Sequence, residues 1–211
     1  MDLVFFGIQG SGKGTQTKIF AEKIKAKIFE AGAELRQIAA ENSELGNKIR
    51  DIINSGKLVP TEVVMEVCEN FINKKCRTSD KIIFDGIPRS MEQKIIFDQI
   101  LKKNNRDFCG VLIDLSEQEA INRLLKRRIC EKCKKVFSVD FSEENCEVCG
   151  EKLIQRSDDN EKSILVRLEN FKKETVPVIE EVAEQKKLIK INGNQEILKV
   201  AEDLFLKLKE I

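Results

Sequence analysis

The segment from Gly7 to Thr15 has residue types and spacing suited to holding a polyphosphate. It reads Gly-Ile-Gln-Gly-Ser-Gly-Lys-Gly-Thr, which matches the pattern Gly-x4-Gly-Lys. In such a loop the backbone N–H groups turn inward, and the lysine adds a mobile positive charge for the β- and γ-phosphates. The hydroxyl that serves Mg²⁺ normally follows the lysine directly. Here Gly14 takes that place and the hydroxyl is displaced to Thr15.

Two other interpretations of this loop are weaker. A dinucleotide-binding Gly-x-Gly-x-x-Gly pattern fails, because Thr15 stands where the third glycine belongs. A glycine-rich turn without any ligand is the second alternative. However, the apolar run Leu3–Phe6 precedes the loop, and a helical pattern runs from Thr15 to about Lys27. Strand, turn and helix in this order favour a nucleotide site at the start of the helix.

Four of the seven cysteines are spaced like metal ligands. Cys130-x2-Cys133 and Cys146-x2-Cys149 are separated by 12 residues, and two such pairs can enclose a tetrahedral thiolate site, typically for zinc. Four thiolates would leave no position for a catalytic water, so this zinc would be structural. Reduced surface cysteines or a redox pair are the alternatives. The other three, Cys68, Cys76 and Cys109, are interpreted as packing residues.

Composition excludes several kinds of protein. The chain of 211 residues has no His, Tyr or Trp, so histidine cannot act as a general base, and catalysis must rely on Lys, Arg, carboxylates, backbone groups and metal. A net charge of +1, from 37 basic and 36 acidic residues, argues against a general nucleic-acid or membrane-surface binder. No apolar run is long enough to span a membrane. The early strand and loop leave no room for a cleavable signal, so we expect a reducing, cytoplasmic location.

The elements that must position these groups alternate between strand and helix. Five short apolar runs are predicted as strands: Leu3–Phe6, Lys27–Phe29, Ile82–Phe84, Val111–Leu115 and Leu188–Ile191. The helical patterns between them predict an α/β fold with a parallel sheet wrapped by helices. Two stretches interrupt the alternation. Residues 30–59 carry short helical patterns at Ala33–Glu41 and Ser43–Asn54, and residues 129–156 hold the four spaced cysteines.

Several motifs together resemble the adenylate kinase family over nearly the whole chain. They are the phosphate loop, Leu35-Arg36, Ser43-Glu44-Leu45-Gly46, Gly56-Lys57-Leu58-Val59, Asp85-Gly86-Ile87-Pro88-Arg89, Arg127-Arg128, Arg156-Ser157-Asp158-Asp159 and Arg167. The chain is similar to the long bacterial-type form with a zinc-held lid. The resemblance implies a five-stranded core of residues 1–29, 60–121 and 160–211, an AMP-binding insertion of residues 30–59, and a lid of residues 122–159.

The implied reaction is ATP + AMP = 2 ADP with Mg²⁺, in a monomer that binds neither nucleic acid nor membrane. Phosphoryl transfer between anions requires charge neutralisation, alignment and exclusion of water rather than a covalent catalyst. Arginines suit this task because the planar guanidinium makes permanently charged, bidentate contacts.

On the ATP side, the resemblance implies that the phosphates are held by Gly10, Ser11, Gly12, Lys13, Gly14 and Thr15, with Arg123 and Arg127 reaching in from the lid. It also implies that Val136 and Phe137 flank the adenine, that Gln195 contributes a backbone contact to it, and that Asp85 orients Mg²⁺ through water. Arg156 and Arg167 would flank the transferring group, next to Asp158 among the catalytic residues.

On the AMP side, Arg36 and Arg89 would grip the phosphate, and Gln93 would read the edge of the base, since an amide offers both a donor and an acceptor. The other implied AMP contacts are Ala31, Lys57, Leu58, Val59, Gly86, Ile87, Pro88, Arg156 and Arg167. One departure matters here. The family usually has Thr-Gly-Asp where this chain has Ala31-Gly32-Ala33, so one side-chain contact to the AMP nucleoside is missing.

Three alternatives to an adenylate kinase stay open. A nucleoside monophosphate kinase with relaxed acceptor choice is suggested by Ala31 and Ala33. A nucleotide-dependent switch is disfavoured, because Asn73-Lys74-Lys75-Cys76 lacks the final Asp of a guanine-reading motif. A zinc-ribbon nucleic-acid binder is suggested by the basic residues around the first cysteine pair, although the near-zero net charge argues against it.

Overall fold

The centre of the molecule is a five-stranded parallel sheet in the order β2-β3-β1-β4-β8. The computed structural model describes residues 1–78, 80–137 and 141–209. The strands are β1 (Asp2–Phe6), β2 (Lys27–Glu30), β3 (Ile82–Asp85), β4 (Phe108–Asp114) and β8 (Leu188–Asn192). All five predicted strands are present. β4 begins earlier than expected, because Phe108 and Cys109 pair with Asp2 and Leu3 of β1.

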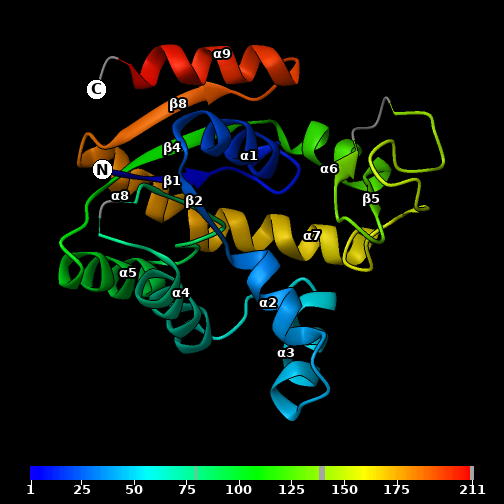
Figure 1. Cartoon of the computed structure of the whole chain (residues 1–211), viewed down its shortest axis with the longest axis horizontal. Helices are drawn as coiled ribbons and strands as arrows, with labels where there is room; N and C mark the ends of the chain where they lie inside the picture. Colours follow the sequence, from blue (N-terminus) through cyan, green and yellow to red (C-terminus); the bar gives the residue numbers. More distant parts are fainter. Residues whose placement is uncertain (79, 138–140, 210–211) are drawn as a thin grey trace.

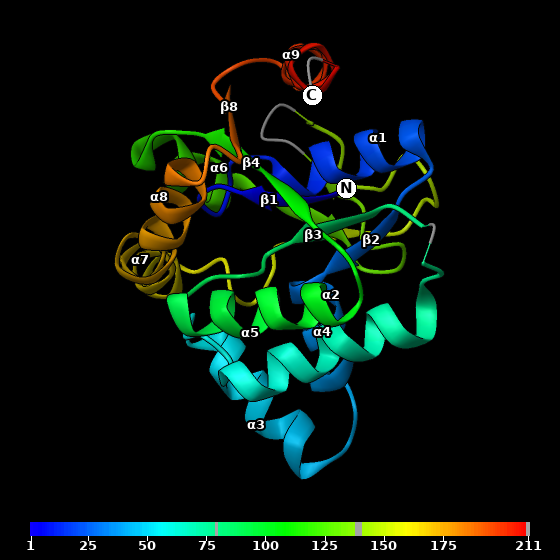
Figure 2. The same ribbon diagram turned by 90° about the vertical axis from the view of Figure 1, so that its left-hand side faces the viewer.

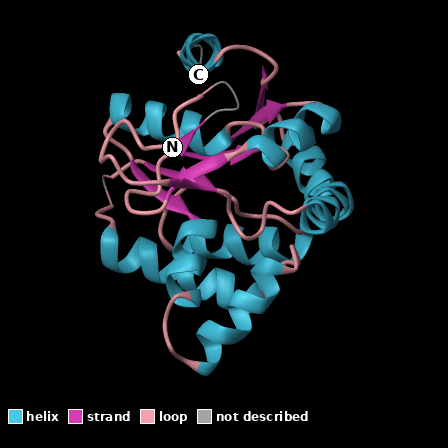
Figure 3. Ribbon diagram, turned by 90° about the vertical axis from the view of Figure 1, so that its right-hand side faces the viewer, coloured by secondary structure: helices cyan, strands magenta, loops and turns pink. Residues whose placement is uncertain are grey.

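Helices cover both faces of this sheet, as Figures 2 and 3 show. Alternate residues of β1 divide between two cores, because successive strand side chains point to opposite faces. Leu3 and Phe5 pack with α1 (Lys13–Ile24) and α9 (Ile197–Leu208). Val4 and Phe6 pack on the other side with α4 (Thr61–Lys75), α5 (Met91–Lys103) and α8 (Val176–Glu184). The sheet is thereby buried on both faces, as parallel sheets require.

Several helices begin where a short polar side chain caps them. Ser43, Ser90, Ser116 and Asn160 each accept a hydrogen bond from the backbone N–H three residues later, at the starts of α3 (Glu44–Asn54), α5, α6 (Glu117–Lys126) and α7 (Glu161–Asn170). α1 has no side-chain cap, since it starts at Lys13 inside the glycine loop, and it ends before Lys25, which has a left-handed φ of 53°. It is therefore shifted toward the N-terminus relative to the prediction.

Two excursions leave the sheet at its carboxyl edge (Figure 1). The first contains α2 (Ala31–Ala39) and α3, and α2 follows β2 without a loop, which starts it two residues before the predicted Ala33. The second is a small antiparallel sheet of β6 (Val136–Phe137), β5 (Arg128–Cys130) and β7 (Leu153–Ile154), in that order. Residues 138–140 of this predicted lid lie outside the described part of the chain.

A long helical rod then returns the chain to the core. α7 continues through the π-helical segment η1 (Phe171–Thr175) directly into α8. Within the described ranges, none of the helices combines the length and apolar character needed to cross a membrane.

Candidate functional site

A cavity of about 1170 Å³ lies between the carboxyl edge of the sheet and the two excursions. This volume exceeds the roughly 300–1,000 Å³ usual for a single small-molecule site. Nearly every residue that the sequence assigned to nucleotides lines it: Gly10, Ser11, Gly12, Lys13, Gly14, Thr15, Ala31, Arg36, Lys57, Leu58, Val59, Asp85, Gly86, Arg89, Gln93, Arg123, Arg127, Val136, Phe137, Arg156, Asp158, Arg167 and Gln195. Ile87 and Pro88 do not line it, and Ile87 is buried in the core.

The glycine loop forms the middle of the cavity and can only be made from glycine at its tightest points. Gly7 has a φ of 146°, and a Cβ there would lie 2.6 Å from the carbonyl oxygen of Ile113. Gly10 has a φ of 89°, and its Cβ would lie 2.9 Å from the carbonyl oxygen of Ala120 on α6. The loop therefore packs directly on β4 and α6, and it delivers the N-terminus of α1 into the cavity, where an anion is favoured.

Lys13 and Asp85 face the same part of the cavity with perturbed acidities. Burial lowers the pKa of Lys13 to about 8, against the opposing charge of Asp85. Burial also raises the pKa of Asp85, against the opposing charge of Lys13. The Lys13 ammonium donates a hydrogen bond to the carbonyl oxygen of Ile8 at 3.3 Å. Both groups are thus held in low dielectric beside the loop, where a polyanion and its counterion would stabilise their charged forms.

Three arginines converge on one side of the cavity because two buried aspartates hold them. Asp159 accepts from Nε and Nη2 of Arg127 at 2.7 and 2.6 Å, and from Nη1 of Arg167 at 3.1 Å. Asp158 accepts from Nε and Nη2 of Arg156 at 2.8 and 2.5 Å. Burial alone would raise the pKa of Asp158, but the charges of Arg156 and Arg167 hold it below its usual range. These pairs keep positive charge at the cavity wall.

Arg89, another arginine of the cavity, is held by hydrogen bonds at its side chain and its backbone. Its Nε donates to the carbonyl oxygen of Gly86 at 2.8 Å, and its own carbonyl oxygen accepts from the hydroxyl of Thr175 at 2.8 Å. Burial lowers the pKa of Arg89, yet a guanidinium stays charged at neutral pH. The Oε1 of Gln93, which is 2% exposed, accepts from the Arg89 N–H at 2.8 Å. One lone pair of this amide is therefore engaged with the backbone, which leaves the second lone pair and the NH2 group for a ligand.

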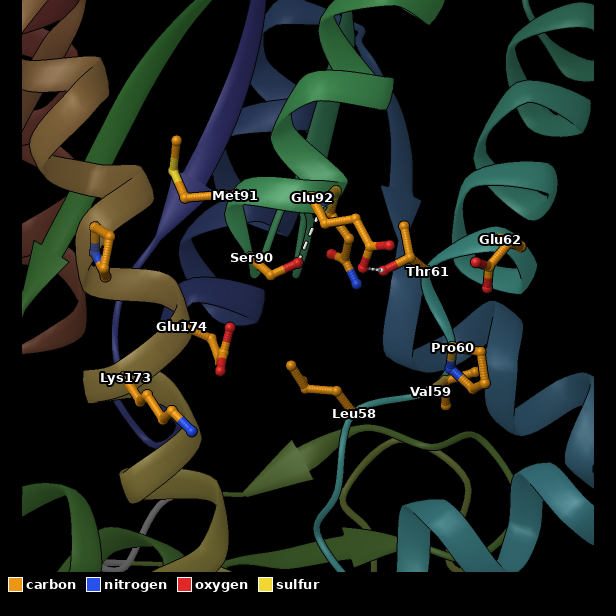
Figure 4. A pocket seen from close by; sticks show the side chains of 12 residues that line it. Leu58, Val59, Pro60, Thr61, Glu62, Ser90, Met91, Glu92, Lys173 and Glu174 are labelled. Carbon is orange, nitrogen blue, oxygen red and sulfur yellow. Dashed lines mark hydrogen bonds between the residues drawn. The ribbon is translucent and has the colours of Figure 1, made fainter.

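A second cavity, of about 430 Å³, lies beside the starts of α4 and α5 (Figure 4). Leu58, Val59 and Gln93 line both cavities and form the wall between them. Within it, the hydroxyl of Thr61 donates to Glu92 Oε2 at 2.6 Å, as Figure 4 shows. This bond ties the start of α4, directly after the first excursion, to the start of α5.

The end of the large cavity next to α6 is flanked by groups from α6, from the second excursion and from the segment after β8. The Nε of Arg123 donates to Glu119 Oε1 at 2.8 Å and its Nη1 donates to the carbonyl oxygen of Gly193 at 3.3 Å. Val136 is 45% exposed, whereas Phe137 is 4% exposed and packs against Phe141 with the rings tilted and their centroids 4.5 Å apart. The Phe137 ring therefore belongs largely to the small core of the second excursion, although it also borders the cavity.

The four predicted metal ligands come together in the second excursion. The sulfur atoms of Cys130, Cys133, Cys146 and Cys149 lie within 4.8 Å of one another, with Cys130–Cys149 at 3.3 Å and Cys133–Cys146 at 3.5 Å. Four thiolates around a zinc ion at about 2.3 Å from each require separations of about this size. The cluster fits a structural zinc ion.

Some residues that organise the site were not assigned from the sequence. In the sequence, Asp159 is distinguished only by its position beside Asp158, and no sequence pattern indicates that its carboxylate binds two arginines. Glu30, the last residue of β2, lies 3.3 Å from Arg36, and Glu119 precedes Arg123 by one helical turn. Only the spacing of Glu119 and Arg123 could have been recognised as a candidate ion pair.

Comparison with known proteins is consistent with this geometry. The family model described as adenylate kinase matches residues 5–187. An adenylate kinase of Petrotoga mobilis is 37% identical over 210 residues, which cover 97% of this chain and 96% of the relative. Adenylate kinases of Fervidobacterium nodosum and Pseudothermotoga lettingae are 35% and 33% identical, and the matches cover 97% and 100% of this chain and 96% and 99% of the relatives.

Proposed function

Since the chain belongs to the adenylate kinase family, a family of phosphotransferases, we propose that its large cavity binds ATP and AMP together and aligns them for transfer. The observation that carries this proposal is the arrangement of charge. The phosphate loop lines a cavity large enough for two nucleotides, and arginines from separate elements line the same cavity. Such positioning and charge neutralisation account for most of the catalysis of phosphoryl transfer.

The residues divide into a donor side and an acceptor side. Gly10–Thr15, Arg123 and Arg127 hold the ATP phosphates, while Val136, Phe137 and Gln195 border its base. Arg36 and Arg89 hold the AMP phosphate, and the segment Lys57–Val59 with Gln93 borders the acceptor base. Arg156 and Arg167, fixed by the paired aspartates, stabilise the charge of the group in transfer.

Mg²⁺ fits beside Asp85. The carboxylate lies next to the phosphate loop, because a Cβ on Gly14 would be 3.4 Å from Asp85 Oδ2, and carboxylate and hydroxyl oxygens are the ligands that this hard cation prefers. When bound with ATP, the ion neutralises phosphate charge. The chain's own contribution is a buried carboxylate that orients the ion's water shell.

The insertions of residues 30–59 and 122–159 act as separate units that close over the nucleotides, while residues 1–29, 60–121 and 160–211 form the core. Closure excludes water and prevents hydrolysis of ATP. Zinc at Cys130, Cys133, Cys146 and Cys149 maintains the shape of the lid. The four thiolate ligands must stay reduced, which a reducing cytoplasm provides. The protein acts there as a monomer.

The decisive experiment is a coupled assay of ADP formation from ATP with AMP, UMP, CMP and GMP in turn. Rapid turnover with AMP alone supports an adenylate kinase, and no turnover with any acceptor refutes the proposal. Comparable rates with several acceptors would instead support a relaxed monophosphate kinase. That second candidate is motivated by Ala31, which is 3% exposed and lines the acceptor side without any polar side-chain atom.

A further inference from the structure

Gln16 makes a hydrogen bond that joins the phosphate-loop helix to the far end of the chain. Its Nε2 donates to the carbonyl oxygen of Ile197 at 2.8 Å, across 181 residues. The side chain is buried, with 3% exposed, and it lines the large cavity. Its Oε1 is buried and accepts no hydrogen bond from any described residue. Leaving such an acceptor without a partner is costly, so its position beside the cavity calls for an explanation.

The bond from Gln16 fixes one end of the loop Asn192–Leu198, which here includes the last residue of β8 and the first two residues of α9. The other end is held by the Gly193 N–H, which donates to the carbonyl oxygen of Asp114 at 2.7 Å. At the α9 end, the capping residue Glu196 makes no side-chain hydrogen bond to the helix. Gln16 therefore supplies a side-chain anchor at the point where the loop enters α9.

The same loop presents a surface that suits a flat heterocyclic base. Ile197 and Leu198 line the cavity with 47% and 72% of their surface exposed, and Gln195 lines it beside them. An apolar shelf next to backbone polar groups can stack a base and read its edge. This end also contains Arg123 and Phe137, which the proposed function places on the donor side.

We propose that Gln16 is a positioning residue that fixes the loop Asn192–Leu198 against the donor base and thereby sets donor-base selectivity. The Nε2 group holds the loop in register with the phosphate loop. The Oε1 atom, unpartnered among the described residues, is the cost of directing the Nε2 group toward Ile197. A loop held in this register fits adenine, and a 6-oxo purine, which lacks the exocyclic amino group, tests that fit. The inference rests on the proposed function, because it requires the donor nucleotide to occupy this end of the cavity.

The test compares Gln16→Met with Asn170→Leu. Methionine keeps the length of the side chain and removes both polar atoms. Asn170 is a matched control, since its Nδ2 donates to the carbonyl oxygen of Gly56 at 3.2 Å and so anchors the segment on the acceptor side. For each variant the measurements are KM for ATP, KM for AMP, the ratio of kcat/KM for ATP over ITP, and the melting temperature.

Gln16→Met should raise the ATP KM about three- to tenfold, as expected for loss of one net hydrogen bond, and should lower the ATP/ITP ratio without moving the AMP KM. Asn170→Leu should raise only the AMP KM. An unchanged ATP KM and ATP/ITP ratio in folded Gln16→Met, or parallel rises in both KM values, would overturn the inference. If Gln16→Met does not fold, Gln16→Glu, which keeps the shape and loses the donor, decides by the same readouts. Wild-type turnover of ATP with AMP is measured first, so a failure there would refute the proposed function rather than this inference.

Discussion

Replacing Asp159 by asparagine removes the charge that holds two arginines at the cavity wall. The carboxylate is fully buried and accepts three hydrogen bonds, two from Arg127 at 2.7 and 2.6 Å and one from Arg167 at 3.1 Å. Asparagine has nearly the same shape, but it presents an NH2 group to one of the guanidinium groups. The substitution therefore isolates the charge from the packing.

The size of the effect follows from burial. Breaking a buried ion pair while leaving the partner charge costs about 3–5 kcal/mol. The arginine side chains are 16% and 12% exposed, and this residual contact with water places the expected loss near the lower limit, at about 3 kcal/mol. For a chain of this size that corresponds to a fall of about 6–12 °C in melting temperature. Since Arg127 and Arg167 also lose their orientation, kcat/KM should fall about a hundredfold.

Asp2→Asn is the matched control for stability. Asp2 is 3% exposed and accepts from Arg106 at 3.0 and 2.9 Å, but it lies at the opposite edge of the sheet, outside the cavity. This variant should lose similar stability and keep its activity. Thermal unfolding and ADP-coupled kinetics are compared at a temperature where both variants are folded. Equal kcat/KM values for the two variants would refute the idea that Asp159 positions catalytic arginines.

The remaining predictions concern the loop lysine, the metal and the acceptor side. Because burial lowers the pKa of Lys13 to about 8, the ligand-free lysine loses its proton as the pH rises through that value. ATP should then bind with uptake of a proton, and its affinity should fall above about pH 8. Calorimetry in buffers of different ionisation enthalpy should detect the proton uptake, and Lys13→Arg should abolish the uptake. Chelation of the metal, or Cys146→Ser, should lower the melting temperature, whereas the protein with cobalt in place of zinc should retain its activity. A hundredfold difference in turnover between the folded cobalt and zinc forms would contradict a structural role. Ala31→Thr should lower the AMP KM by up to about tenfold and leave the ATP KM alone, and an unaltered AMP KM would mean that other groups already supply this contact.

The alternation of strands and helices and the phosphate loop could be predicted because their signals are local. An apolar run such as Leu3–Phe6, followed by closely spaced glycines and a lysine, specifies strand, turn and helix within a few residues of each other. The cysteine pairs are local in the same sense, since a ligand pair two residues apart needs only one turn of chain. Element boundaries were less certain, as β4 shows, because pairing with a distant strand extends a strand beyond its own apolar run.

The tertiary structure decided which polar side chains far apart in the sequence become hydrogen-bond partners. No spacing rule connects Arg127 with Asp159, or Gln16 with Ile197, because the folded core alone brings them within hydrogen-bond distance. The same holds for Phe137, which a motif places beside a base and the structure packs largely into the core of the second excursion. The lowered pKa of Lys13 likewise exists only once the cavity walls remove it from water, because desolvation is a property of the assembled fold and not of the loop sequence.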